Sequence, residues 1–359
     1  MKYSGENMSK AQSQKLSAFE ILFGMGGFGV LLFGIFYLSA HFTPWSMPIL
    51  IVAEGALFAT PHFLSTFVRV LSDPAETERH RFNLFLLPIL LFAGLMSWST
   101  LFGTEMIWIF GSLYFYWQWW HHARQSFGLG RYYQSQDQIL APQDRLLNDL
   151  ALWTVALLGI ALRSTAAGEQ YEGIPIQTIH LPVSSLSYIF SACVIVVLFF
   201  LIKRLPSLIF NPSSRPFFIH WLIQSFVFVV FFGLLPAGLG IIAASLWHCT
   251  QYLTYSWRHQ QKKHQSVGFA NLPLSKIFQP KAIIFYLGGL IILALIKFQF
   301  DRQVIFPAQI AGLAFAYSLA INFQHYILDG ILWTRKEIDW SLGKGRQIEP
   351  TGAIMPVIR

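Results

Sequence analysis

Residues 184–203 read SSLSYIFSACVIVVLFFLIK, and this stretch decides the class of fold. It contains no acidic residue, and its one basic residue, Lys203, stands at its end. A helix needs about 20 predominantly apolar residues to cross the hydrocarbon core of a bilayer. A run of this length and composition therefore predicts a transmembrane helix.

Similar apolar runs occur along the whole chain. They lie at residues 17–40, 47–70, 83–99, 105–125, 148–165, 217–234, 237–257, 283–299 and 306–333. With the first stretch they make about ten spans. We therefore predict an all-α, polytopic membrane helix bundle that forms one transmembrane domain over residues 1–359. The segment Leu235-Pro236-Ala237-Gly238 suits either a tight reversal or a kink in one long helix.

The composition excludes several classes of protein. Hydrophobic residues make up 54% of the 359 residues and charged residues only 12%, whereas a soluble domain carries roughly 25% charged residues. The mean hydropathy is +0.50. The net charge of +8 does not indicate a nucleic-acid partner, because the basic residues lie in short loops between apolar runs. No phosphate-binding or dinucleotide-binding glycine motif is present, so we do not expect the chain to bind ATP or NAD. The expected partners are the lipid bilayer and a hydrophobic small molecule.

The positions of the basic residues predict the orientation of the chain. With ten spans, nearly all Lys and Arg residues fall on the side of the two tails, 1–16 and 334–359. The opposite side keeps Arg163, Lys297 and Arg302. Cytoplasmic loops are enriched in Lys and Arg, so we expect both termini to be cytoplasmic.

Polar residues inside five of the predicted helices lie at matching depth. At 1.5 Å per residue, their histidines fall in one layer, roughly 5–14 Å inside the cytoplasmic face. An ionisable side chain at a helix centre costs about 2.5–3.5 kcal/mol on insertion scales. We interpret the shared layer as one buried polar site, like the metal sites in helix-bundle cores. The candidate metal ligands are His62, His121, His122, His248, His325 and Asp329.

The spacing of these residues fits metal ligation. His325 and Asp329 are separated by four residues and share a helix face. His121 and His122 point about 100° apart, so we expect only one of them to face the site. His122 and His248 each begin an H-x-x-Q pattern, in which the glutamine could fix the imidazole tautomer, and this favours His122. Imidazole with carboxylate suits non-haem iron, manganese or zinc.

Three further residues are candidates for catalytic roles. Tyr252 and Gln251 follow His248 and could orient a substrate or an oxygen species. Glu54 lies deeper than His62 on the second predicted span, about 80° round the helix. It is either a proton-relay or substrate-binding group, or a protonated packing residue.

Each candidate also has an interpretation without a metal. A single histidine in a membrane helix is often a hydrogen-bonded packing residue. Asp329 could pair with Arg335 or Lys336 at the end of its helix. His220, in the first turn of its span, belongs either to the site or to the membrane interface.

Two stretches of the sequence resemble the histidine boxes of known membrane enzymes. Gln118-Trp119-Trp120-His121-His122 resembles the Q-x-x-H-H histidine box of membrane fatty-acid desaturases and hydroxylases. Residues His259 to His264 resemble an H-x4-H box. The first resemblance implies that His121 and His122 bind iron.

The general plan also resembles the bacterial membrane β-carotene dioxygenases of the bacteriorhodopsin-related-protein type. The features that carry this resemblance are Pro61-His62 and the single histidines His248 and His325. In that family, single histidines from several transmembrane helices bind one ferrous iron. The resemblance implies an O2-using enzyme of the bacterial inner membrane that acts on a lipid or isoprenoid.

Three functional hypotheses follow. The leading one is a membrane metalloenzyme, a non-haem iron oxidoreductase whose apolar substrate enters laterally from the bilayer. The number of iron ions, one or two, and the electron donor stay open. The second hypothesis is a haem protein with two facing histidines as axial ligands. The third is a proton-coupled transporter in which Glu54, Asp329 and the histidines relay protons.

Overall fold

The computed structural model describes residues 17–40, 42–102, 107–135, 137, 140–164, 170–171, 174–179, 181–265, 275–301, 308–334, 347–348 and 354–355. This part of the chain is helical, apart from two-residue strands that pair as β1 (Gln170–Tyr171) with β2 (Ile174–Pro175) and β3 (Gln347–Ile348) with β4 (Ile354–Met355). The predicted all-α class is therefore confirmed. The N-terminal tail 1–16 and most of the tail 334–359 lie outside the described residues.

Each predicted apolar run coincides with a helix. The first half contains η2 (Glu20–Gly24), α1 (Gly27–Ser39), α2 (Ser46–Ala53), η3 (Glu54–Ala59), α3 (Thr60–Leu71), α4 (Pro74–Arg79), η4 (Phe82–Leu86), α5 (Leu87–Phe102), α6 (Ile107–Ser135) and α7 (Pro142–Arg163). The second half contains α8 (Val183–Phe210), α9 (Arg215–Phe226), η6 (Val227–Leu234), α10 (Ala237–His264), η7 (Ser275–Phe278), η8 (Pro280–Ala282), α11 (Ile283–Asp301) and α12 (Ala308–Leu332).

Six helical segments of the described chain are long and apolar enough to cross a membrane. They are Ser46–Leu71, Phe82–Phe102, Pro142–Arg163, Ser184–Ser207, Arg215–Leu234 and Pro280–Lys297. By length and composition, these six segments fit an integral membrane protein. The longer helices α6 and α10 carry many polar residues, which lowers their hydropathy. The count of about ten spans therefore stays a prediction.

The chain reverses at Leu235 and Pro236. Helix η6 ends at Leu234, both following residues have extended ψ angles of 155° and 142°, and α10 begins at Ala237. Proline cannot donate a backbone hydrogen bond, which favours a new helix start at this position. Because α10 packs back against η6, the segment is a tight reversal rather than a kink in one helix.

Three helices continue well beyond their predicted ends. Helix α6 runs to Ser135, α8 to Phe210 and α10 to His264, whereas the apolar runs end at 125, 203 and 257. The predicted ends were wrong because hydropathy marks where lipid contact stops, not where a helix stops. The polar extensions are held by ion pairs, such as Arg131 with Asp149 and Lys263 with Asp73.

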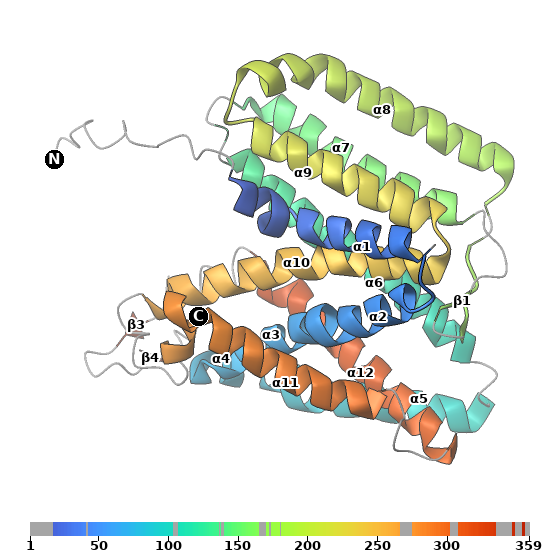
Figure 1. The fold of residues 1–359 in the computed structure, drawn as a ribbon, viewed down its shortest axis with the longest axis vertical. Coiled ribbons are helices and arrows are strands. Elements are labelled where there is room, and N and C mark those ends of the chain that lie inside the picture. Colours follow the sequence, from blue (N-terminus) through green and yellow to red (C-terminus); the bar gives the residue numbers. More distant parts are fainter. Residues whose placement is uncertain are drawn as a thin grey trace.

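Helices α6 and α10 lie between two groups of helices (Figure 1). One group contains α1, α7, α8 and α9, and the other contains α2, α3, α5, α11 and α12. Helix α10 is buried along most of its length, with Trp247 fully buried. Close packing against α1 depends on Gly29, because a Cβ there would clash with the backbone oxygen of Leu246. Helix α8 forms one edge of the bundle and exposes Ile195, Leu198, Phe199 and Ile202, as a lipid-facing helix would.

Candidate metal centre

Three helices bring the central side chains together. His62 lies near the start of α3, directly after the π-helical segment η3 and Pro61. His121 comes from α6, and His325 and Asp329 come from α12. π-Helical turns are rare and frequently occur at functional sites. The change from π- to α-helical bonding occurs where Pro61 cannot donate a backbone hydrogen bond.

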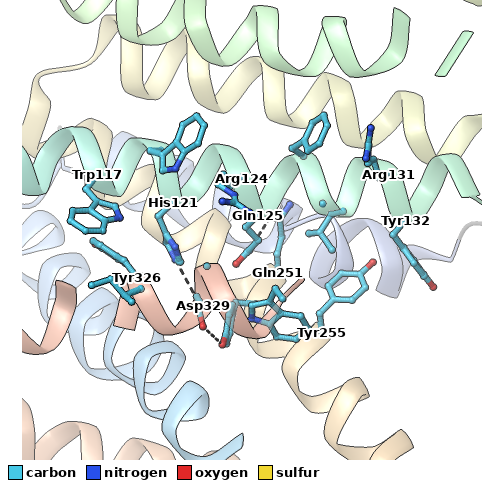
Figure 2. Close-up of a pocket in the computed structure, with 18 residues that line it drawn as sticks. Trp117, His121, Arg124, Gln125, Arg131, Tyr132, Gln251, Tyr255, Tyr326 and Asp329 are labelled. Carbon is cyan, nitrogen blue, oxygen red and sulfur yellow. Dashed lines mark hydrogen bonds and ion pairs between the residues drawn. The ribbon is translucent and has the colours of Figure 1, made fainter. Parts of the chain in front are cut away.

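His62, His121, His325 and Asp329 form one buried group, called here the metal group. Each offers one ligand atom, and these four atoms all lie within 4.8 Å of one another. Nε2 of His325 is 2.8 Å from Nε2 of His62. Oδ2 of Asp329 lies 3.6 Å from Nε2 of His325 and 3.7 Å from Nε2 of His121. Figure 2 shows His121 pointing toward Asp329.

Hydrogen bonds hold the carboxylate of Asp329 in place. Its Oδ1 accepts from the hydroxyl of Tyr252 at 2.8 Å and from that of Thr66 at 3.0 Å. These two hydroxyls also contact each other at 2.5 Å. Oδ2 has no hydrogen-bond donor in the described part of the chain. One carboxylate oxygen is thus fixed by neutral donors, and the other faces the imidazoles.

The donor atoms fit a metal ion. The Nε2 of His121 and the Oδ2 of Asp329 are buried without a hydrogen-bond partner among the described residues, and each such group costs roughly 1–3 kcal/mol. Two ligands at about 2.1 Å from one ion lie at most about 4.2 Å apart. The separations of 2.8, 3.6 and 3.7 Å are within that limit, and the other pairs, all within 4.8 Å, exceed it by at most about 0.6 Å. The metal group could therefore hold an ion, whose identity the geometry leaves open.

His122 and His248 form a second pair beside the metal group. Their rings stack at 4.1 Å between centroids, and the ring of His248 also contacts those of His62 at 4.8 Å and His121 at 4.7 Å. Neither nitrogen of His248 has a hydrogen-bond partner in the described chain. The metal group thus contains His121, whereas the sequence favoured His122, and His248 packs against it without belonging to it.

The proposed role of the H-x-x-Q glutamines was wrong. Gln125 donates to the backbone oxygen of His248 at 3.1 Å and to the side chain of Gln251 at 3.4 Å. Gln251 in turn donates to the backbone oxygen of Met25 at 3.0 Å. The two amides therefore tie α6, α10 and the break before α1 together, and they do not orient an imidazole.

Two other candidates lie outside the metal group. Nε2 of His220 is 2.9 Å from the backbone oxygen of Ser126 and 3.2 Å from its hydroxyl, which is a helix-packing role. Glu54 accepts a 2.5 Å hydrogen bond from Ser245 on α10. The predicted alternative partners of Asp329, Arg335 and Lys336, lie outside the described residues.

A cavity of about 930 Å³ opens beside the metal group. It lies between α6, α10 and α12, and His121 and Asp329 both line it (Figure 2). Tyr252 and Gln251 also line it. The metal group is therefore buried in the bundle and accessible from one side.

Sequence reasoning missed two residues of this region. Thr66 binds Asp329, and its position four residues after His62, on the same helix face, was a usable signal. Arg124 lines the cavity one turn after His121. No family model, no curated protein and no solved structure matches this chain.

Proposed function

We propose that this protein is a membrane-embedded metalloenzyme, a non-haem iron oxidoreductase that uses O2 to oxidise an apolar, lipid-like substrate. The observation that carries the proposal is the metal group of three imidazoles and one carboxylate at the wall of a cavity of about 930 Å³. A structural metal site is closed by protein ligands, whereas a catalytic site keeps an open position. Two ligands facing a cavity suit the catalytic kind.

The choice of iron rests on the donor set. Histidines with one carboxylate and open coordination positions are the ligands of non-haem ferrous oxygenases. The donors here are nitrogen and oxygen atoms, and neither buried cysteine belongs to the metal group. Zinc accepts similar donors, so the metal must be measured.

The packing of the rings favours a non-haem centre over haem. The rings of His62, His121 and His325 lie 4.6 to 6.0 Å apart between centroids. At these distances the imidazoles contact one another directly. Two axial ligands of a haem would instead be separated by the porphyrin.

Tyr252 has a positioning role in this proposal. Its hydroxyl donates to Oδ1 of Asp329 and thereby leaves Oδ2 for the metal. Partners of this kind orient ligands and tune metal affinity. Glu54, bonded to Ser245, lies outside the metal group, and the proposal gives it no role.

The deciding experiment is metal analysis by mass spectrometry, with an optical spectrum, on detergent-purified protein prepared without chelators. We expect stoichiometric iron and no Soret band. The variants His325→Ala and Asp329→Ala should lose the iron and keep the folded elution profile. His220→Gln is the matched control, because His220 is equally buried but lies outside the metal group, and it should keep the iron.

Three results would contradict the proposal. A Soret band would indicate haem, and stoichiometric zinc without iron would indicate a hydrolytic or structural site. Protein without any metal would leave the histidine layer as a polar or proton-conducting site and would favour transport.

A further inference from the structure

Arg124 is an unpaired cation on the wall of the cavity. It follows His121 by three residues on α6, so the two side chains share a helix face. Its side chain is exposed, and it forms no ion pair within the described part of the chain. Arg131, the other arginine of the wall, is neutralised by Asp149 at 2.7 Å.

The cavity wall has an excess of positive charge. Its one carboxylate among the described residues is Asp329, which belongs to the metal group and accepts hydrogen bonds from Tyr252 and Thr66. Arg124 therefore remains without a counter-charge on the wall. A guanidinium in this position suits a carboxylate or phosphate, with which it can form paired, charge-assisted hydrogen bonds.

Aromatic side chains line the cavity on both sides of Arg124. Trp117, Trp120 and Tyr326 lie on the side of His121, and Phe127, Tyr132 and Tyr255 lie on the other. Figure 2 shows Trp117 and Tyr326 close together on one side of His121, with Arg124 on the other. An apolar chain that starts from a head group at Arg124 and passes His121 would lie along Trp117, Trp120 and Tyr326.

The cavity is also elongated. Its lining on α6 extends from Trp117 to Tyr132, which is about 22 Å at 1.5 Å per residue, and Arg124 lies about 10 Å from the Trp117 end. The volume of about 930 Å³ lies at the upper end of the roughly 300–1,000 Å³ common for small-molecule sites. Both properties suit a ligand whose chain extends from Arg124 past His121 toward Trp117.

We infer that the ligand of this cavity is an anionic amphiphile, with a carboxylate or phosphate head group bound by Arg124 and an acyl-like chain along Trp117, Trp120 and Tyr326. This inference rests on the proposed function, because it names the substrate class of the same site. Arg124 and His121 are separated by about 4.5 Å along the helix axis. The atoms closest to the metal group are therefore the first few carbons after the head group.

The test is competition against radiolabelled oleate bound to the full chain in a non-ionic detergent. The competitors are unlabelled oleate, oleyl alcohol and oleoyl lysophosphatidate, which share the chain and differ in the head group. We expect the anions to compete about tenfold or more better than the alcohol. The stronger of the two anions identifies the head group as carboxylate or phosphate.

Two variants assign this preference to one residue. Arg124→Gln should weaken binding of the anions about tenfold or more and leave the alcohol unchanged. Arg131→Gln is the matched control and should keep the preference, because that charge is already neutralised. An unchanged metal content and elution profile of Arg124→Gln would show that it is folded.

The outcomes separate this inference from the proposed function. Equal competition by oleate and oleyl alcohol, or an unchanged preference in Arg124→Gln, would overturn the inference even in an iron-loaded protein. A preference that depends on Arg124 in wild-type protein that purifies without iron would support the inference and contradict the proposed function.

Discussion

Asp137 and Asp329 are equally buried, each 4% exposed, but their surroundings differ. Asp137 lies between α6 and α7, and both of its oxygens accept hydrogen bonds. The donors are Asn211, Ser213, Ser214 and Arg204. Asp329 has donors on Oδ1 alone, while Oδ2 faces two imidazoles without a hydrogen bond in the described chain.

This comparison separates a structural carboxylate from a candidate ligand. The charge of Asp137 is balanced by Arg204, itself 4% exposed. Asp329 forms no ion pair with a lysine or arginine among the described residues. Burial alone does not distinguish the two aspartates. What distinguishes them is whether the protein itself satisfies both oxygens.

Of the substitutions suggested by this comparison, Asp137→Ala should lower the free energy of unfolding the most. This change leaves the buried Arg204 with Asp144 at 3.3 Å as its remaining ion-pair partner among the described residues, and should cost about 3 kcal/mol. Asp329→Ala in the metal-free protein should cost only about 1 kcal/mol, because the hydroxyls of Thr66 and Tyr252, which lie in contact, can then bond to each other. Thermal unfolding in detergent with a chelator, followed by circular dichroism, measures both.

The opposite order of stabilities would contradict the distinction between a structural Asp137 and a metal-binding Asp329. If Asp329→Ala were the more destabilised of the two without metal, Asp329 would be a structural residue like Asp137. The metal content of each variant, measured on protein prepared without chelator, provides the second readout. We expect Asp137→Ala to keep its metal in the fraction that folds.

A smaller effect is expected when Asp329 keeps its charge but loses one donor. Tyr252→Phe removes the 2.8 Å hydrogen bond to Oδ1, and metal affinity should fall about 10- to 100-fold. Competition with a chelator of known affinity measures the change. Tyr255→Phe is the control, because Tyr255 lies on the same helix but bonds to Glu20. An equal fall in both variants would mean that Tyr252 acts on packing and not on the metal group.

The depth of the site could be predicted from the sequence. Helix rise per residue is fixed, so counting from the ends of the apolar runs placed His62 and His325 at one level. The structure brings their Nε2 atoms to 2.8 Å. The same counting also placed His220 in this layer, although it bonds to Ser126 instead. Depth in the bundle is readable from sequence, but lateral position is not.

The rotation of each helix could not be predicted. His121 and His122 differ by about 100° around α6, and only packing against the neighbouring helices decides which one faces α12. The H-x-x-Q pattern favoured His122, but Gln125 bonds to the backbone of α10. A glutamine one turn from a histidine can bond in either direction along the surface, so this pattern carries little information about rotation.

A third aspartate gives the smallest expected effect and extends the comparison to the surface. Asp149 bonds to Arg131 at 2.7 Å, and the Arg131 side chain is 63% exposed. Solvent screens such a pair, which contributes about 0–1 kcal/mol. Asp149→Asn should therefore change the free energy of unfolding by less than about 1 kcal/mol and leave the metal content unchanged.

The same substitution would, however, release Arg131 as a second unpaired cation on the cavity wall. Tighter oleate binding by Asp149→Asn, with unchanged binding of oleyl alcohol, would show that unpaired arginines on this wall select the anionic head group. An unchanged oleate affinity would restrict that role to Arg124, one turn from His121.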